Sequence, residues 1–323
     1  MTNCNLCPRK CGANRQTGHH GVCGAPAEIK VALSQLHMWE EPPISGENGS
    51  GTIFFSHCPL KCVYCQNRTI SAEGKGQVAS IEQLQEIMLD LQQKGAENIN
   101  FVTGTQWAPQ IVEAVNGVRR ALKTPIVWNT SSYETPETIE MLNEIIDIYL
   151  ADFKYYSNDL AKKFSGVSDY FEVATSAISA MLSNEGSHPC CRESSEILSK
   201  NLERDQLSRR FGQLNSEAIP QENSGFEKQV IVRHLVLPGH IDDSKKVIKH
   251  VEDTCGNKVK LSIMSQYTPV IKDKQVLEKY PELGRTLSKE EYEEVLDYAD
   301  SLGIEDYFWQ EGETCKESFI PNF

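Results

Sequence analysis

Three cysteines of the chain stand within one short segment, FFSHCPLKCVYCQN (residues 54–67), at the end of an apolar run. Their spacing is Cys58-x3-Cys62-x2-Cys65. A structural zinc ion needs four protein ligands, and so do the clusters of simple ferredoxins. Three thiolates on one loop instead leave one iron of a [4Fe–4S] cluster open to a small molecule, which makes the cluster a reaction centre. A zinc site that takes a fourth ligand from elsewhere in the chain is the alternative.

A second set of cysteines lies at the amino terminus, where residues 1–25 show neither helical nor strand periodicity. A segment this small has no core of its own, and we expect it to fold around a metal. Four thiolates can close a zinc site or hold a second iron–sulfur cluster, and both remain open; the candidates are Cys4, Cys7, Cys11 and Cys23. The adjacent Cys190 and Cys191 are poor chelating partners, so we expect them to be solvent-facing thiols.

The composition excludes several classes of function. The chain has 323 residues, 11 cysteines and a formal net charge of −13, and the phosphate backbone of nucleic acids repels so acidic a protein. No apolar run reaches the roughly 18 residues that a membrane span needs, and the amino terminus has no apolar signal core. Clustered cysteines without an export signal are typical of metal sites in a reducing cytoplasm, where we expect the protein to reside.

Short buried strands alternate with amphipathic helices along most of the chain, and the three-cysteine loop follows the first strand. The expected strands are 52–56, 98–104, 125–129, 146–153, 229–237 and 259–264. The expected helices are 80–95, 109–122, 136–146, about 169–182 and 242–254. This alternation predicts parallel strands joined by right-handed crossovers. Six units are too few for a complete eight-unit barrel, so we expect an α/β fold, an incomplete (β/α)6 barrel.

The predicted domain organisation has two parts. Residues 1–50 are a Cys-rich N-terminal extension, and residues 51–323 are the barrel. Residues at about 183–226 interrupt the barrel pattern with a stretch rich in Ser, Glu, Asn and Arg. A polar stretch of this kind is typical of an inserted, mobile loop.

Polar residues follow the expected strands at the edge where parallel α/β folds place their chemistry. Cys58 follows the first strand, Thr103-Gly104-Thr105 the second and Asn129 the third, while Asp152 and Lys154 close the fourth. Each has an ordinary explanation on its own, such as a strand-end ion pair that faces solvent. Their common edge is what predicts a single site.

The cysteine spacing, with Tyr64 just before the last cysteine, resembles the radical S-adenosylmethionine superfamily. CVYCQNR (62–68) is similar to the corresponding loop of pyruvate formate-lyase activating enzymes, and VRHLVLPGHIDDS (232–244) is similar to their fifth-strand segment. The chain resembles more closely an uncharacterised branch related to those enzymes. The segments that carry this likeness are CNLCPRKC, GVCG, WNTSSYE, YLADFKYY, RHLVLPG and IMSQYTP. The resemblance covers nearly the whole chain apart from 183–226 and implies a radical SAM barrel.

The resemblance also implies roles for individual residues. Cys58, Cys62 and Cys65 would hold a [4Fe–4S] cluster, and the amino and carboxylate groups of S-adenosyl-L-methionine would chelate its open iron. Tyr64 would lie against the adenine. Lys154 and Arg233 match basic residues that engage the cofactor, with Arg233 at its carboxylate.

Two positions depart from the family pattern. Thr103, Gly104 and Thr105 stand where the family has a Gly-Gly-Glu turn that receives the methionyl amino group, and Thr105 takes the place of the glutamate. Asn129 takes the place of an aspartate, while Asp152 matches an aspartate of the family's cation site, so a monovalent cation there is in doubt. Residues that we expect to line the substrate space are Met264, Gln266 and Tyr267, although Met264 is equally compatible with packing.

The expected activity is reductive cleavage of S-adenosylmethionine and hydrogen abstraction from a substrate, with activation of a glycyl radical enzyme as the leading case. An enzyme acting on another peptide or on a small molecule is one alternative, and a non-catalytic iron–sulfur electron-transfer protein is another. The implied partners are a protein or peptide substrate and an electron donor such as flavodoxin or ferredoxin. Neither nucleic acid nor a membrane is expected as a partner.

Overall fold

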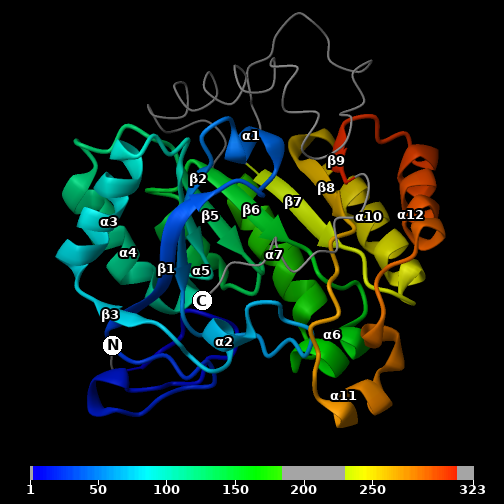
Figure 1. The fold of residues 1–323 in the computed structure, drawn as a ribbon, viewed down its shortest axis with the longest axis horizontal. Coiled ribbons are helices and arrows are strands. Elements are labelled where there is room, and N and C mark those ends of the chain that lie inside the picture. Colours follow the sequence, from blue (N-terminus) through cyan, green and yellow to red (C-terminus); the bar gives the residue numbers. More distant parts are fainter. Residues whose placement is uncertain (1–2, 184–229, 311–323) are drawn as a thin grey trace, which may run out of the picture.

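The computed structural model describes residues 3–183 and 230–310 of the chain. Nine strands form one sheet in the order β3-β1-β2-β4-β5-β6-β7-β8-β9, with helices against one face (Figure 1). The strands are β1 Ile29–His37, β2 Ser50–Phe55, β3 Gln77–Ala79, β4 Ile99–Val102, β5 Ile126–Thr130, β6 Ile148–Asp152, β7 Val230–Leu235, β8 Lys260–Met264 and β9 Tyr307–Trp309. From β2 to β9 every neighbouring pair is parallel. The six predicted strands are all present, and the α/β prediction is confirmed.

The helices between the parallel strands are the crossovers that such a sheet requires. The helices are α1 Pro42–Ser45, α2 Arg68–Ser71, α3 Ile81–Gln93, α4 Ala108–Val118, α5 Pro136–Leu142, α6 Asn158–Ser165, α7 Tyr170–Leu182, α10 Ile241–Cys255, α11 Lys274–Lys279 and α12 Lys289–Ser301. The five predicted helices correspond to α3, α4, α5, α7 and α10. Helix α3 begins as predicted at Ser80, whose hydroxyl accepts from the Gln83 backbone in a capping box.

Three strands were not predicted from the sequence. β1 pairs antiparallel with both β2 and β3, so it belongs to the sheet although it lies within the segment 1–50. Its burial does not alternate strictly, and its register with β2 shifts between Val31 and Leu33, which obscures a period of two. β3 and β9 have only three residues each, too few to show any period.

The inner face of the sheet changes from apolar to polar along the strands. Val127, Ile148, Leu150 and Ile231 form a buried cluster with Ile44 of α1 and Phe308 of β9. Side chains two apart on a strand share a face, so Asn129, Asp152 and Arg233 continue this inner face toward the carboxyl ends. The apolar layer therefore supports a polar layer above it, at the edge where the three-cysteine loop begins.

Within the described residues, no helix is long and apolar enough to cross a membrane. The insert expected at about 183–226 lies, from residue 184 on, outside the described residues, and Cys190 and Cys191 lie there too.

Candidate cofactor-binding site

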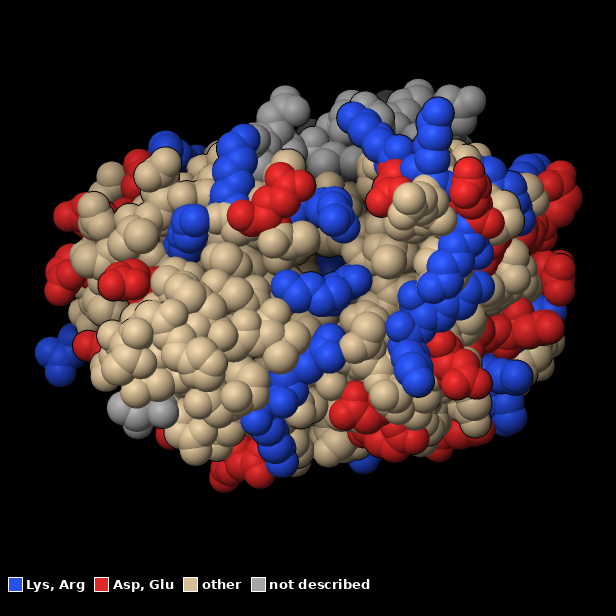
Figure 2. Space-filling view, turned by 90° about the horizontal axis from the view of Figure 1, so that it is seen from below, with Lys and Arg blue, Asp and Glu red and all other residues tan. Residues whose placement is uncertain are grey.

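A cavity of about 260 Å³ lies between the three-cysteine loop and the polar inner face of the sheet. Its lining includes the predicted residues Cys58, Cys62, Tyr64, Cys65, Thr103, Asn129, Asp152, Lys154, Arg233, Met264, Gln266 and Tyr267. Figure 2 shows the lower side of Figure 1, where Lys and Arg side chains surround a central hollow. Lys61 in the three-cysteine loop and Arg68 at the start of α2 are exposed. This face is therefore basic around the hollow, although the net charge of the chain is −13.

Helices α6 and α2 hold the three-cysteine loop in place through hydrogen bonds. The carboxyl end of α6 accepts two of its backbone N–H groups, from Lys61 to the Ser165 carbonyl at 3.2 Å and from Val63 to the Phe164 carbonyl at 2.8 Å. The sulfurs also have hydroxyl partners: Cys62 Sγ lies 2.9 Å from Ser165 Oγ, and Cys65 Sγ lies 3.3 Å from Ser71 Oγ.

The donor set of this loop fits an iron–sulfur cluster better than a single ion. Among the described residues, no three His, Cys, Asp or Glu side chains are grouped so that they could hold one metal ion. Thiolates that bind a [4Fe–4S] cluster each reach a different iron, so they need to border a shared space rather than meet at one point. Burial, with the other two cysteines adding to it, raises the pKa of Cys58, and burial raises the pKa of Cys62 to about 11. Without a metal the thiols of Cys58 and Cys62 are thus protonated at neutral pH.

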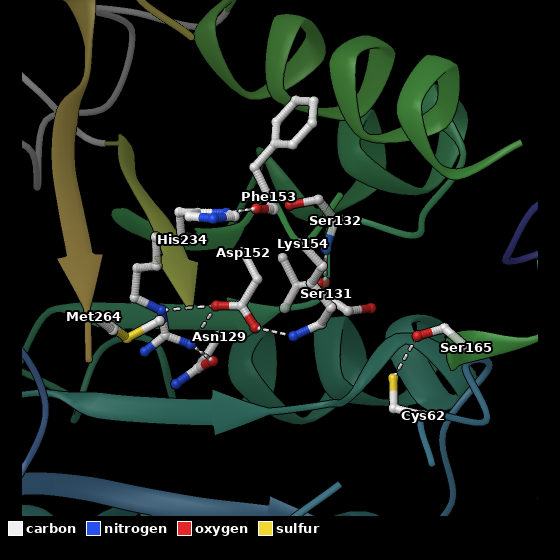
Figure 3. Close-up of polar contacts among 12 residues, drawn as sticks. Cys62, Asn129, Ser131, Ser132, Asp152, Phe153, Lys154, Ser165, His234 and Met264 are labelled. Atoms are coloured by element: carbon white, nitrogen blue, oxygen red, sulfur yellow. Dashed lines mark hydrogen bonds and ion pairs between the residues drawn. The ribbon is translucent and has the colours of Figure 1, made fainter. Parts of the chain in front are cut away.

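Arg233 is the centre of a buried ionic network on the inner face. Its guanidinium donates to Asp152 Oδ1 at 2.8 Å through Nε and to Asn129 Oδ1 at 2.6 Å through Nη2. It also donates to Glu40 Oε2 at 2.9 Å through Nη1. Lys154 Nζ donates to Asp152 Oδ2 at 2.7 Å, so Asp152 bridges the two cations (Figure 3). Although burial opposes ionisation, Arg233 and Lys154 lower the pKa of Asp152, which keeps the carboxylate charged.

Glu40 and Glu41 were not identified from the sequence. Glu40 lines the cavity, and its second oxygen accepts from Asn100 and Asn129, both at 3.1 Å. Glu41 Oε2 lies 3.6 Å from Arg233 Nη1. Burial raises the pKa of Glu41, Arg233 opposes that rise and Glu40 adds to it. The pair precedes Pro42-Pro43 in a segment without periodicity, and two acidic residues beside two prolines are too weak a signal to indicate burial.

The Thr103–Thr105 turn presents only one of its side chains to the cavity. Thr103 lines the cavity and has a positive φ of 58°, a conformation that favours glycine. Thr105 is buried on the other side, where its hydroxyl donates to Glu134 Oε1 at 2.7 Å. Gly104 packs against Ile111 and Trp128. Of the three predicted residues, the structure therefore brings Thr103 to the other site residues and directs the Thr105 hydroxyl elsewhere.

The N-terminal cysteines lie around a second, much smaller cavity. Cys4, Cys7, Cys11 and Cys23 line a space of about 10 Å³ together with Arg15, Pro59, Thr105 and Gln106 among others. Arg15 is buried, and its Nη2 lies 3.1 Å from Cys4 Sγ and 4.0 Å from Cys23 Sγ. Its Nη1 donates to the Gln106 carbonyl. The four cysteines therefore line one cavity, next to Pro59 of the three-cysteine loop.

The model of the Radical SAM superfamily matches residues 52–188, a span that includes the three-cysteine loop, Thr103, Asn129, Asp152 and Lys154. An uncharacterized protein of Methanocaldococcus jannaschii is 27% identical over 311 residues, which cover 94% of this chain and 76% of that protein.

Among solved structures, Streptococcus suis SuiB bound to the precursor peptide SuiA is 12% identical with a TM-score of 0.44, over 80% of this chain and 47% of that chain. The chain thus spans about half the length of SuiB. A mutant of spore photoproduct lyase is 10% identical with a TM-score of 0.41, over 84% of this chain and 78% of that chain.

Proposed function

We propose that this chain, which has a radical SAM domain at residues 52–188, is an enzyme that reductively cleaves S-adenosylmethionine and abstracts hydrogen from a substrate. One observation carries the proposal: the three thiols of one loop border the same cavity as the cations Lys154 and Arg233. When bound, the [4Fe–4S] cluster and S-adenosylmethionine supply the electron transfer, the carbon–sulfur bond cleavage and the hydrogen abstraction.

The residues of the chain would position these groups. Cys58, Cys62 and Cys65 hold the cluster in this proposal. Lys154 and Arg233 offer buried positive charge to the cofactor carboxylate, and Asp152 keeps both cations in place through its two oxygens.

The remaining predicted residues differ in how they could contact the cofactor. Asn129 and Thr103 offer polar groups at the cavity wall, and Tyr64 offers an aromatic ring. We assign the contact with the amino group of the cofactor to Thr103, because the hydroxyl of Thr105 is engaged by Glu134. Gly104 would act only by allowing the turn to pack.

Activation of a glycyl radical enzyme is the finer proposal, and it is supported by the likeness of CVYCQNR to the loop of pyruvate formate-lyase activating enzymes. A glycyl Cα–H is a suitable target because flanking amides stabilise the resulting radical. The basic surroundings of the hollow (Figure 2) favour an acidic partner, such as a flavodoxin or ferredoxin that delivers electrons. Another peptide or a small molecule as the substrate, and a purely electron-transferring role, are the alternatives, and formation of 5'-deoxyadenosine separates the last of these from the others.

The N-terminal cysteines are proposed as a separate metal site. Buried charges in proteins are paired, and none of the ion pairs among the described residues involves Arg15. The sulfurs of Cys4 and Cys23 lie within its reach, and thiolates bound to a metal there would balance its charge. The four cysteines line one small cavity, and both a zinc ion and a second iron–sulfur cluster remain open for it.

Anaerobic reconstitution with iron and sulfide, followed by reduction and assay for 5'-deoxyadenosine, tests the proposed activity. We expect the parent protein to form 5'-deoxyadenosine and Cys62→Ala to form none, because loss of one thiolate releases the cluster. Cys255→Ala is the matched control, since Cys255 ends α10 and does not line the cavity. A parent protein that takes up the cluster but forms no 5'-deoxyadenosine would instead support the electron-transfer alternative.

A further inference from the structure

A chain of hydroxyl groups leads to the sulfur of Cys62. Tyr64 Oη lies 2.6 Å from Tyr155 Oη, which lies 2.7 Å from Ser165 Oγ. Ser165 Oγ in turn lies 2.9 Å from Cys62 Sγ, a contact drawn in Figure 3. Tyr64, Tyr155 and Ser165 are all buried, so these hydroxyls satisfy one another rather than water.

The position of Ser165 is fixed by the way in which α6 ends. Ser165 is the last residue of the helix, and Gly166 caps it in the left-handed conformation with φ of 67°. The carbonyl groups of a last helical turn have no partner within the helix. Here the carbonyls of Phe164 and Ser165 are used by the N–H groups of Val63 and Lys61 in the three-cysteine loop. The Ser165 hydroxyl is therefore held against the loop by the backbone on both sides of the contact.

The direction of the hydrogen bonds follows once the sulfur binds a metal. A metal-bound thiolate carries no proton and can only accept, so Ser165 must donate to Cys62. The Ser165 oxygen then accepts from Tyr155, and the Tyr155 oxygen accepts from Tyr64. All donors point toward the sulfur, and each hydroxyl in the chain polarises the next.

We propose that Ser165, supported by Tyr155 and Tyr64, is a positioning residue that raises the reduction potential of the iron–sulfur cluster by donating a hydrogen bond to Cys62. This inference rests on the proposed function, because it requires Cys62 to be a cluster ligand. Reduction adds one electron and therefore negative charge, and a hydrogen bond to a ligand sulfur stabilises the more negative form.

Potentiometric titration of the reconstituted protein tests this proposal without any turnover. Reduced cluster is measured by electron paramagnetic resonance, with titanium(III) citrate as the one-electron donor and mediators to fix the potential. For Ser165→Ala we expect the ratio of reduced to oxidised cluster at a given potential to fall about tenfold, equivalent to about 59 mV toward more negative values. Tyr155→Phe should shift the ratio in the same direction but less, because Ser165 remains.

The matched control is Ser179→Ala, since the Ser179 hydroxyl donates to the Thr175 carbonyl within α7. It should leave the potential unchanged. A Ser165→Ala protein that holds a full cluster at the parental potential would overturn the proposal. If the Ser165→Ala protein does not take up cluster, the reduction potential of the Tyr155→Phe protein is the test instead. An unchanged potential in Tyr155→Phe would then overturn the proposal. A parent protein that takes up no cluster refutes the proposed function itself, which separates the two failures.

Discussion

Arg233 and Glu40 are 193 residues apart in the chain, yet Arg233 Nη1 donates to Glu40 Oε2 at 2.9 Å. Glu40 follows β1, whose last residue His37 pairs with Ser50 at the start of β2. It therefore enters the sheet's inner face from the amino-terminal ends of the parallel strands. Arg233 meets it from β7, and the two side chains form the floor of the cavity that the three-cysteine loop covers.

Glu40→Ala should destabilise the fold by about 3 kcal/mol, because removal of one partner leaves a buried charge uncompensated. Arg233 would still be paired with Asp152, so we expect a cost at the lower end of the range for breaking a buried ion pair. Urea unfolding of the full chain measures the change. Asp253→Ala is the control: the pair Lys249–Asp253 has side chains that are 53% and 56% exposed, and its loss should leave stability nearly unchanged. Equal effects of the two substitutions would show that Glu40 is not paired with Arg233 in solution.

The parallel strands from β2 to β8 could be predicted because each is short, buried and separated from the next by an amphipathic helix. Ser80 illustrates why boundaries could be placed as well, since a capping box uses residues at a fixed spacing. β1 could not be found, because its register shift and half-buried residues remove the period of two. α6 was missed for a different reason: it has only eight residues, and few of them are apolar.

The site was predictable where a single loop or strand end supplies the chemistry, as for Cys58, Asp152 and Lys154. It was not predictable where chemistry depends on contacts between distant segments. Glu40 and Ser165 have no local motif, and their importance comes from Arg233 and Cys62, which lie far away in the sequence. A resemblance is also a limited guide to contacts: it implied that Thr105 faces the cofactor, whereas the Thr105 hydroxyl donates to Glu134.

Glu134 should make stability depend on pH. Burial raises its pKa above the ordinary value of 4.5, while hydrogen bonds from Thr105 and Trp128 limit that rise. Between the unfolded and the raised folded pKa, the native state binds more protons than the unfolded state, so stability falls as pH rises through that window. Glu134→Gln cannot ionise and removes this slope, which is at most about 1.4 kcal/mol per pH unit.

Urea unfolding from pH 5 to 8 compares the slopes of the parent and Glu134→Gln. Glu113→Gln, the same substitution at an exposed position of α4, is the matched control. Parallel curves for the parent and Glu134→Gln would show that Glu134 titrates in the folded protein as it does in the unfolded chain.

Gly104→Ala should destabilise the protein by about 1–3 kcal/mol, because a buried site without space must shift its neighbours. An added Cβ would lie 2.7 Å from Ile111 Cδ1 and 2.8 Å from Trp128 Cη2, and both side chains are fully buried. Gly117→Ala in α4 is the control, since its Cβ would meet only the flexible amide of Gln85. The helix preference for alanine, about 1 kcal/mol, should offset that contact. Equal unfolding midpoints for the two variants would contradict the tight packing of the Thr103–Thr105 turn.

The N-terminal cysteines provide the remaining prediction. Replacement of Cys7 and Cys11 by Ser should release the metal of this site, zinc or a second cluster, and leave the iron of the three-cysteine loop in place, because the two sets line separate cavities. Metal binding and local folding are one event in a segment without its own core, so residues 3–25 should also become sensitive to protease. Elemental analysis for zinc and iron, with limited proteolysis, measures both effects, and Cys255→Ser is the matched control. Loss of iron in steps would identify a second cluster instead of zinc. Unchanged zinc and iron would show that these four cysteines hold no metal.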